Sequence, residues 1–238
     1  MKLVEYIKND IINKKDRYEG RKFYNRKGKG YRAKMKDIVD SSGEIRTIYL
    51  PADTSVYFNY FKMLVNQKIN YLLSNEVTIE DNDLVTATEV TDLLEELGLN
   101  ASLDTMAWLH FYIEDNKLEW IVVKDSEIMP IYDKYHKKIV KVIRYYLIDE
   151  DTYYIEDWDL SGVKVSKIRK DEVVESEQCS HFIETIEYQE VIEDQVFRNL
   201  PFIPFIPLFN NKLKEGDIDG IGSLLEMYSS INSGLIDN

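Results

Sequence analysis

Residues 199–220 read NLPFIPFIPLFNNKLKEGDIDG, and this stretch decides how the chain is organised. Pro201, Pro204 and Pro207 fall within seven positions, among Phe and Ile residues. Because each proline removes a backbone donor and clashes with a helical turn, no helix can run through the stretch. The spacing also suits a polyproline ligand, but such ligands are exposed and flanked by charge, whereas large apolar side chains fill these gaps. We therefore expect a buried, extended segment that crosses the fold.

The end of the stretch, EGDIDGIGSLLE, resembles a calcium-binding loop. Positions one, three, five, six and twelve of that pattern are taken by Glu215, Asp217, Asp219, Gly220 and Glu226. Position one prefers Asp, however, Gly222 stands where an apolar residue is usual, and the prolines exclude an entering helix. We expect no metal here, and we expect Asp217 or Asp219 to cap the helix that follows.

Composition indicates a globular protein of one large or two small domains. The 238 residues are 44% hydrophobic and 12% aromatic, enough to form a core. Cys179 is the single cysteine, which excludes an internal disulfide and fits a reducing compartment. The N-terminal stretch breaks its apolar runs with charges, and no run approaches the roughly 18 apolar residues of a membrane span. We expect a soluble protein without a secretion signal.

Charge is distributed unevenly along the chain. The net charge is −13, yet residues 14–36 hold eleven Lys and Arg against two acids, which makes this segment +9 and the remainder −22. Aromatic residues interleave with these charges, an arrangement that can stack bases and neutralise phosphates. The alternatives are a solvated loop or a strip that packs against an acidic neighbour. The candidate phosphate or subunit contacts are Arg21, Lys22, Arg26, Lys27, Lys29 and Arg32.

Helices are expected before and after a sheet along the chain. We predict a short helix at 2–13, mostly irregular structure up to 55, and a helix over 55–73. The apolar stripe of the 55–73 helix consists of Tyr57, Phe61, Leu64, Val65, Ile69 and Leu72. Thr86 and Glu89 have capping-box spacing at the start of another helix, and Gly98 is expected to end it. Helical spacing returns after the prolines, at Ile218, Ile221, Leu224, Leu225, Tyr228 and Ile231.

From about residue 106 the pattern changes to short runs rich in Val, Ile and aromatic residues, separated by polar tetrads. This texture is typical of antiparallel hairpins or a meander, with weaker strands continuing over 161–197. The chain is therefore predicted to be α+β, with N-terminal helices, a central mostly antiparallel sheet, an extended Pro-rich crossing segment and a C-terminal helix. The expected parts are a basic segment (1–55), a helical part (56–105), the sheet (106–198), and the Pro-rich segment with the last helix (199–238).

Catalysis finds little support in the sequence. His110, His136 and His181 lack metal-ligand spacing, and no nucleophile elbow, phosphate loop or dinucleotide fingerprint is present. His110 lies in an apolar run and is expected to be a half-buried strand residue. We expect neither an enzyme nor a cofactor.

Four blocks, read in order, resemble the portal proteins of tailed bacteriophages with long non-contractile tails. The blocks are YFKMLVNQKINYLLSNEV at 60–77, AWLHFYIEDNKLEWIVVKDSEIMPIYD at 107–133, KVIRYYLI at 141–148, and FIPLFNNKLKEGDIDGIGSLLEMY ending at Tyr228. RYEGRKFYNR at 17–26 is also similar to a tyrosine-glycine turn of the family. Asn210 and Asn211 match the paired asparagines, Asp217 the helix-opening Asp, and Tyr228 a helical Tyr. Asn66 and Glu226 stand where the family has Asp.

The resemblance implies a structural, non-enzymatic subunit of a ring of about a dozen copies at one capsid vertex. Such a ring binds the terminase motor, lets double-stranded DNA pass during packaging, and joins the head to the tail connector. Implied partners are further copies of the chain, the terminase large subunit, scaffold and major capsid protein, and the head–tail connector, but no membrane. The implied location is the virion, or the host bacterial cytoplasm during assembly.

The resemblance also implies that the chain covers only the peripheral wing of a portal subunit, without stem, clip and crown. A fragment, a truncated prophage gene and a split gene all fit this expectation. If the basic segment meets an acidic face of a neighbouring subunit, neutralising Arg21, Lys22, Arg26 and Lys27 should weaken assembly. The alternative function is a small nucleic-acid-binding accessory protein that uses residues 14–36, for which binding of double-stranded DNA should fall steeply with salt.

Overall fold

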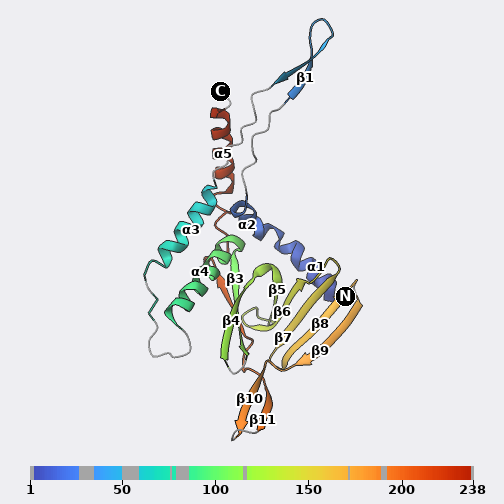
Figure 1. Ribbon diagram of the computed structural model, residues 1–238, viewed down its shortest axis with the longest axis vertical. Coiled ribbons are helices and arrows are strands. Elements are labelled where there is room, and N and C mark those ends of the chain that lie inside the picture. The colour runs from blue at the N-terminus through green and yellow to red at the C-terminus, as the bar shows by residue number, and fades with distance from the viewer. Residues whose placement is uncertain are drawn as a thin grey trace.

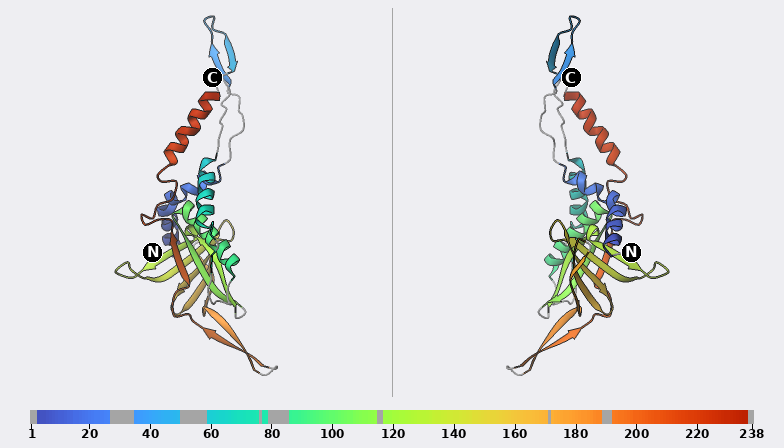
Figure 2. Two further views of the ribbon diagram at one scale, coloured as in Figure 1. Left: turned by 90° about the vertical axis from the view of Figure 1, so that its left-hand side faces the viewer. Right: turned by 90° about the vertical axis from the view of Figure 1, so that its right-hand side faces the viewer.

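The computed structural model describes residues 3–26, 35–49, 59–75, 77–78, 86–114, 117–170, 172–188 and 192–236. It confirms the α+β prediction. In Figure 1 the sheets form a central body, helices cover one end of it, and the hairpin β10–β11 projects from the other end. Helix α5 leaves the helical end and points away from the sheets in all three views (Figures 1 and 2).

The N-terminal region is more ordered than predicted. Helix α1 (Leu3–Lys14) is followed by the 3-10 helix η1 (Lys15–Tyr18), the short helix α2 (Glu19–Tyr24), and a hairpin of β1 (Met35–Val39) and β2 (Ile45–Tyr49). The expectation of mostly irregular structure was therefore wrong here. Val4 and Ile7 of α1 are buried against apolar residues of the larger sheet, including Ile143 and Ile155. This packing places the basic end of α1 beside the sheet.

Helices α3 (Tyr60–Leu72) and α4 (Ala87–Asp104) pack against each other. Three members of the predicted stripe are buried, namely Phe61, Val65 and Ile69, while Leu64 and Leu72 are exposed and Tyr57 lies outside the described residues. The capping box of Thr86 and Glu89 is confirmed. The predicted stop at Gly98 is wrong, because α4 continues to Asp104. A Cβ on Gly98 would lie 3.1 Å from Ile69 Cδ1, so the missing side chain lets α3 come close.

The strands are antiparallel, as the sequence predicted, but they form two main sheets where one was expected. The three-stranded sheet has the order β12-β3-β4, and the five-stranded sheet has the order β5-β6-β7-β8-β9. The strands are β3 (Met106–Glu114), β4 (Lys117–Lys124), β5 (Ile128–Tyr132), β6 (Ile139–Leu147), β7 (Thr152–Asp159), β8 (Gly162–Arg169), β9 (Glu172–Cys179) and β12 (Phe205–Phe209). β10 (Phe182–Tyr188) and β11 (Ile192–Arg198) form the projecting hairpin, and η2 (Asp125–Glu127) links β4 to β5. Both main sheets contribute to one core that includes Trp108 and Trp158.

The proline stretch crosses the fold as expected, but only part of it is buried. β12 pairs with β3 at the edge of the three-stranded sheet, and Phe205 is buried while Ile206 is 52% exposed. Asn210 N–H donates to Thr105 O, and Phe111 N–H donates to Pro204 O. The hydrogen-bonded positions of β12 are therefore the even-numbered ones. The ring nitrogen of Pro207 consequently faces the open edge.

Helix α5 (Gly222–Ile236) begins later than predicted. Residues 217–221 form turns, and the carboxylates of Asp217 and Asp219 bind other groups, described below, so neither caps α5. Gly222 N–H donates instead to Ile218 O at 2.8 Å, and buried Ile218 packs in a cluster with Phe61 and Leu103. Among the described residues, no helix is long and apolar enough to span a membrane.

Candidate functional site at the base of the C-terminal helix

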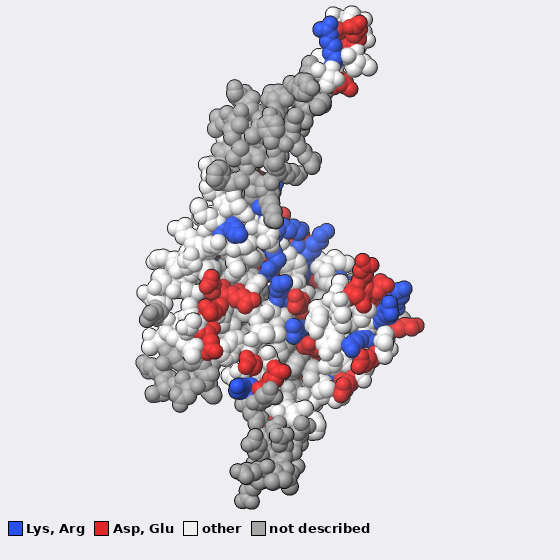
Figure 3. All heavy atoms as spheres, in the orientation of Figure 1, with Lys and Arg blue, Asp and Glu red and all other residues white. Residues whose placement is uncertain are grey.

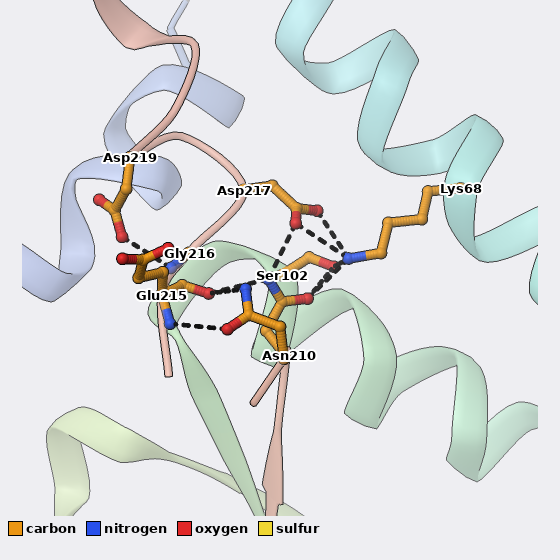
Figure 4. Close-up of polar contacts among 8 residues, drawn as sticks. Lys68, Ser102, Asn210, Glu215, Gly216, Asp217 and Asp219 are labelled. Carbon is orange, nitrogen blue, oxygen red and sulfur yellow. Dashed lines mark hydrogen bonds and ion pairs between the residues drawn. The ribbon is translucent and has the colours of Figure 1, made fainter. Parts of the chain in front are cut away.

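The ammonium group of Lys68 collects the polar side chains at the base of α5 (Figure 4). Lys68 Nζ lies 2.9 Å from both carboxylate oxygens of Asp217, 2.6 Å from Asn210 Oδ1 and 3.1 Å from Ser102 Oγ. Lys68 comes from α3, Ser102 from the last turn of α4, and the other two residues from the chain after β12. We call these four residues the Lys68 cluster. It joins three parts of the fold that are distant in sequence.

The two neighbouring asparagines close the loop that leads from β12 to the cluster. Asn210 Nδ2 donates to Glu215 O at 2.9 Å and to Asp217 Oδ1 at 2.8 Å. Asn211 Oδ1 accepts the N–H of Glu215, and Asn211 Nδ2 donates to Glu215 O at 3.0 Å. The backbone N–H of Asp217 donates to Ser102 O at 3.1 Å. Side chains and backbone together fix this loop against the end of α4.

The carboxylates of the apparent calcium loop are directed to different partners. Asp217 binds the Lys68 ammonium, Asp219 Oδ2 accepts the N–H of Gly216 at 2.8 Å, and Glu226 pairs with Arg26 at 3.7 Å. No group of three or more metal-binding side chains occurs in the described parts of the chain. The ammonium group of Lys68 therefore stands where a bound cation would have to sit, which does not fit a calcium site.

A tyrosine pair adds a second contact between α5 and α3. The hydroxyl oxygens of Tyr60 and Tyr228 lie 3.4 Å apart, and their rings meet edge to face with centroids 5.1 Å apart. The hydrogen bond that Tyr60 donates to Tyr228 raises the pKa of Tyr60 above its ordinary value. Tyr24 Oη also donates to Asn66 Oδ1 at 2.7 Å, so α2 is tied to α3 as well. The base of α5 thus rests on a helical platform.

Three residues of the basic segment are bound to acids of the same chain, namely Lys14, Arg17 and Arg21. Lys14 is buried and binds Asp10 at 2.8 Å, and its ammonium group donates to the carbonyl oxygens of Asp125 and Ile128. Arg17 pairs with Asp125 at 3.3 Å. These contacts fasten α1 and η1 to the sheet; Lys14 is buried, whereas Arg17 stays partly exposed while paired.

Arg21 binds a buried carboxylate through several hydrogen bonds. Its Nε lies 3.0 and 3.1 Å from the two carboxylate oxygens of Asp104, its Nη2 also donates to Asp104, and Nη2 donates to Asn100 Oδ1 at 2.6 Å. Asp104 is only 1% exposed. Burial raises the pKa of Asp104, and the Arg21 guanidinium opposes this shift. The Arg21 guanidinium thus has an internal partner, and its use as a phosphate or subunit contact stays a prediction.

The remaining candidates of the basic segment divide into two groups. Lys22 and Arg26 are exposed, and Lys27, Lys29 and Arg32 lie outside the described residues. Figure 3 shows Lys and Arg side chains over α1 and α2 and a group of Asp and Glu side chains over α4 on the same face. The exposed acids of α4 include Asp92, Glu95 and Glu96. The face therefore carries a basic area next to an acidic one.

Two of the histidines, His110 and His181, bind backbone groups of other segments. His110 is buried rather than half-buried, and its Nδ1 lies 3.0 Å from Pro204 O; burial lowers the pKa of His110 to about 4. His181 Nδ1 accepts the N–H of Leu200, and its Nε2 donates to Asp159 O. Sequence reasoning missed Lys68, Ser102, Asp104 and Asp125. No local pattern marks these residues, because each acts on a partner far away in the sequence.

Comparisons with known proteins point in one direction. A family model described as phage portal protein, SPP1 Gp6-like, matches residues 4–238. A portal protein of Clostridium phage phiCD119 is 26% identical over 221 residues, an alignment that covers 79% of this chain and 45% of the relative. The chain thus spans about half the length of that relative.

Proposed function

The chain belongs to the family of SPP1 Gp6-like phage portal proteins, and from that membership we propose that it forms the peripheral wing of a portal subunit. In this proposal residues 1–238 make up one wing-like unit of a ring of about a dozen copies at a capsid vertex. The terminase large subunit packages double-stranded DNA through the ring, and scaffold, major capsid protein and the head–tail connector bind around it. The role is structural and includes no catalytic step of this chain.

The observation that carries the proposal is the way α5 leaves the body. The helix exposes several large apolar residues, namely Leu224 (57%), Met227 (55%) and Ile231 (53%). Apolar side chains on a projecting helix favour burial against another surface, with about 25 cal/mol gained for each Å² removed from water. In a ring, the corresponding surface of a neighbouring copy is always within reach.

The Lys68 cluster supports the same role. A helix that transmits position from the body of one subunit to the next must leave the body at a fixed angle. The cluster and the Tyr60–Tyr228 pair hold the base of α5 from two sides. We propose that Asn210, Asn211, Asp217 and Tyr228, which match the family pattern, set this exit direction.

Charge offers a second contact between neighbouring copies. We propose that the exposed basic residues Lys15 and Lys22 meet the exposed acids of α4 on the next subunit, since the two areas have opposite charge (Figure 3). The bond between Arg21 and Asp104 supports leaving Arg21 out of this proposed surface. Contacts of this kind weaken with salt because exposed charges are screened over about 8–10 Å.

The alternative of a nucleic-acid-binding protein loses support from the structure. Lys14, Arg17 and Arg21 are held by internal acids, which leaves fewer charges of the segment for phosphate contacts. A direct test is binding of a double-stranded DNA fragment at about 50 mM salt, where several phosphate contacts would be strong. We expect no shift in a gel.

Assembly is the decisive measurement for the ring. Mass photometry of the purified chain at low salt should show discrete multiples of its 28.1 kDa mass. Leu224→Glu and Met227→Glu should reduce these species, since a charge on the apolar face opposes burial. Leu160→Glu is the matched control, because Leu160 is also exposed (60%) but lies on the turn between β7 and β8. Equal loss in the control, or none in the α5 variants, would refute the proposed use of this face.

A further inference from the structure

A cavity of about 400 Å³ lies between α1, η2, the turn after β5 and the loop after β12. Its volume falls within the roughly 300–1,000 Å³ range of small-ligand sites. None of the contacts assigned above to the base of α5 uses it. Its lining combines a charged floor, aromatic walls and a basic mouth.

The floor is electrically balanced. Lys14 and Arg17 carry two positive charges, and Asp10 and Asp125 carry two negative ones. Lys14 Nζ lies 2.8 Å from Asp10 and 3.8 Å from Asp125, and Arg17 Nη1 lies 3.3 Å from Asp125. Trp108 Nε1 also donates to Asp125 at 3.1 Å. The floor therefore attracts neither a cation nor an anion strongly.

The mouth adds the positive charge of Lys214, which the floor does not cancel, and the polar ring of His136. Lys214 Nζ lies 4.5 Å from the centre of the Phe209 ring, and the His136 ring lies 6.3 Å from the Tyr132 ring. Within the described parts of the chain, neither Lys214 nor His136 forms a salt bridge. Together with the walls of Phe209 and Tyr132, they offer an anion site above an aromatic surface.

Several residues around the same cavity have positive φ angles, which are unfavourable for non-glycine residues. Four non-glycine residues of the described chain have positive φ, and three of them line the cavity: Thr105 (φ 73°), His136 (φ 53°) and Lys214 (φ 60°). A β-branched residue such as Thr105 rarely adopts this conformation. Such residues persist where surrounding contacts enforce them and cluster at binding sites.

We propose that this cavity binds a single carboxylate carried on an apolar body. The carboxylate would lie at Lys214 and His136, and the apolar part would lie on Met106, Tyr132 and Phe209. A group with several negative charges, such as a polyphosphate, would find no further uncompensated positive charge, because Asp10 and Asp125 already pair with Lys14 and Arg17 in the floor. The ligand is either an Asp or Glu beside an apolar residue in a polypeptide, or a small aromatic acid. The inference does not depend on ring formation.

Trp108 provides a local readout because its indole binds Asp125 in the floor. In the full chain labelled with 5-fluorotryptophan, the Trp108 fluorine signal can be assigned with Trp108→Phe. The probes are the dipeptide acetyl-Asp-Phe-amide, its neutral counterpart acetyl-Asn-Phe-amide, phenylacetate and phenyl phosphate. We expect the Asp-Phe peptide or phenylacetate to shift the signal in the millimolar range, and which of them binds identifies the source of the carboxylate.

Variants at the mouth connect the signal to the cavity. Lys214→Gln and His136→Gln each should weaken binding, the former about tenfold, because a charge-assisted hydrogen bond is lost. Lys134→Gln removes a positive charge from the same turn outside the lining and should leave binding unchanged. No shift with either acid up to about 10 mM, a range that covers even weak sites, would overturn the proposal. Equal binding of the Asn peptide, tighter binding of phenyl phosphate, or an equal loss in Lys134→Gln would overturn it as well.

Discussion

Replacing Arg21 by Met tests whether the basic segment acts inside the subunit or between subunits. The substitution leaves the Asp104 carboxylate, 1% exposed, without its charged partner. Breaking a buried ion pair costs about 3–5 kcal/mol, and we expect a loss near 3 kcal/mol because the Arg21 side chain is 29% exposed. With a urea dependence of about 2–3 kcal/mol per molar, the midpoint of unfolding should fall by about 1 M.

The pH dependence of this loss has a definite sign. Burial raises the pKa of Asp104 above its ordinary value, and Arg21 opposes this shift, so Arg21→Met should raise the pKa further. A carboxyl group whose pKa is raised in the folded state takes up a proton on folding, and the destabilisation fades as pH falls through that pKa. The deficit of Arg21→Met in urea should therefore be smaller at pH 5 than at pH 7.5.

Two further variants complete the experiment. Lys22→Met changes the neighbouring exposed charge and should alter stability by less than about 0.5 kcal/mol. Arg21→Met combined with Asp104→Leu removes both charges and should recover most of the loss. If Arg21→Met unfolded at the wild-type urea concentration but no longer assembled, the internal role of Arg21 would be refuted.

Three further substitutions test the helical platform and the buried histidine. Lys68→Met should destabilise the base of α5 by about 1–2 kcal/mol, because Asp217 loses a half-exposed partner, and hydrogen exchange should accelerate near residues 217–225 but not in the sheets. Gly20→Ala should lower the melting temperature by several degrees, since its Cβ would lie 2.5 Å from Leu103 O, a backbone atom that cannot move aside. His110 stays neutral in the folded protein down to about pH 4, whereas in the unfolded chain it takes up a proton near pH 6.5, so the fold loses roughly 3 kcal/mol of stability as pH falls through this range. His110→Gln should flatten this part of the pH profile of stability. An unchanged pH slope, exchange rate or melting temperature would contradict the corresponding prediction.

Features that depend on neighbouring residues could be predicted from the sequence. The capping box at Thr86, the buried stripe of Phe61, Val65 and Ile69, and the alternation of the strands each follow from a short window. These signals were enough for the α+β class and for the order of its parts.

Features that depend on distant residues could not be predicted. Gly98 was interpreted as a helix stop, and residues 17–26, which include Gly20, were compared with a tyrosine-glycine turn. Each glycine instead allows a close approach, Gly20 to Leu103 O and Gly98 to the Ile69 side chain. Arg21 and Asp104 are 83 positions apart, and nothing in the sequence distinguishes that carboxylate from the other acids of the chain. The helix-cap interpretation of Asp217 failed for the same reason, since it did not anticipate a lysine on α3.

The orientation of Pro207 has a consequence for aggregation. An exposed edge strand offers a row of unpaired donors and acceptors to any other strand, and proteins must guard such edges during folding and at high local concentration. Because the nitrogen of Pro207 faces outward and carries no hydrogen, the outer edge of β12 lacks a donor at its centre. Many copies gathered at one place could otherwise join edge to edge into open-ended fibres. In the proposed ring, the proline stretch would therefore leave contacts between copies to side-chain surfaces.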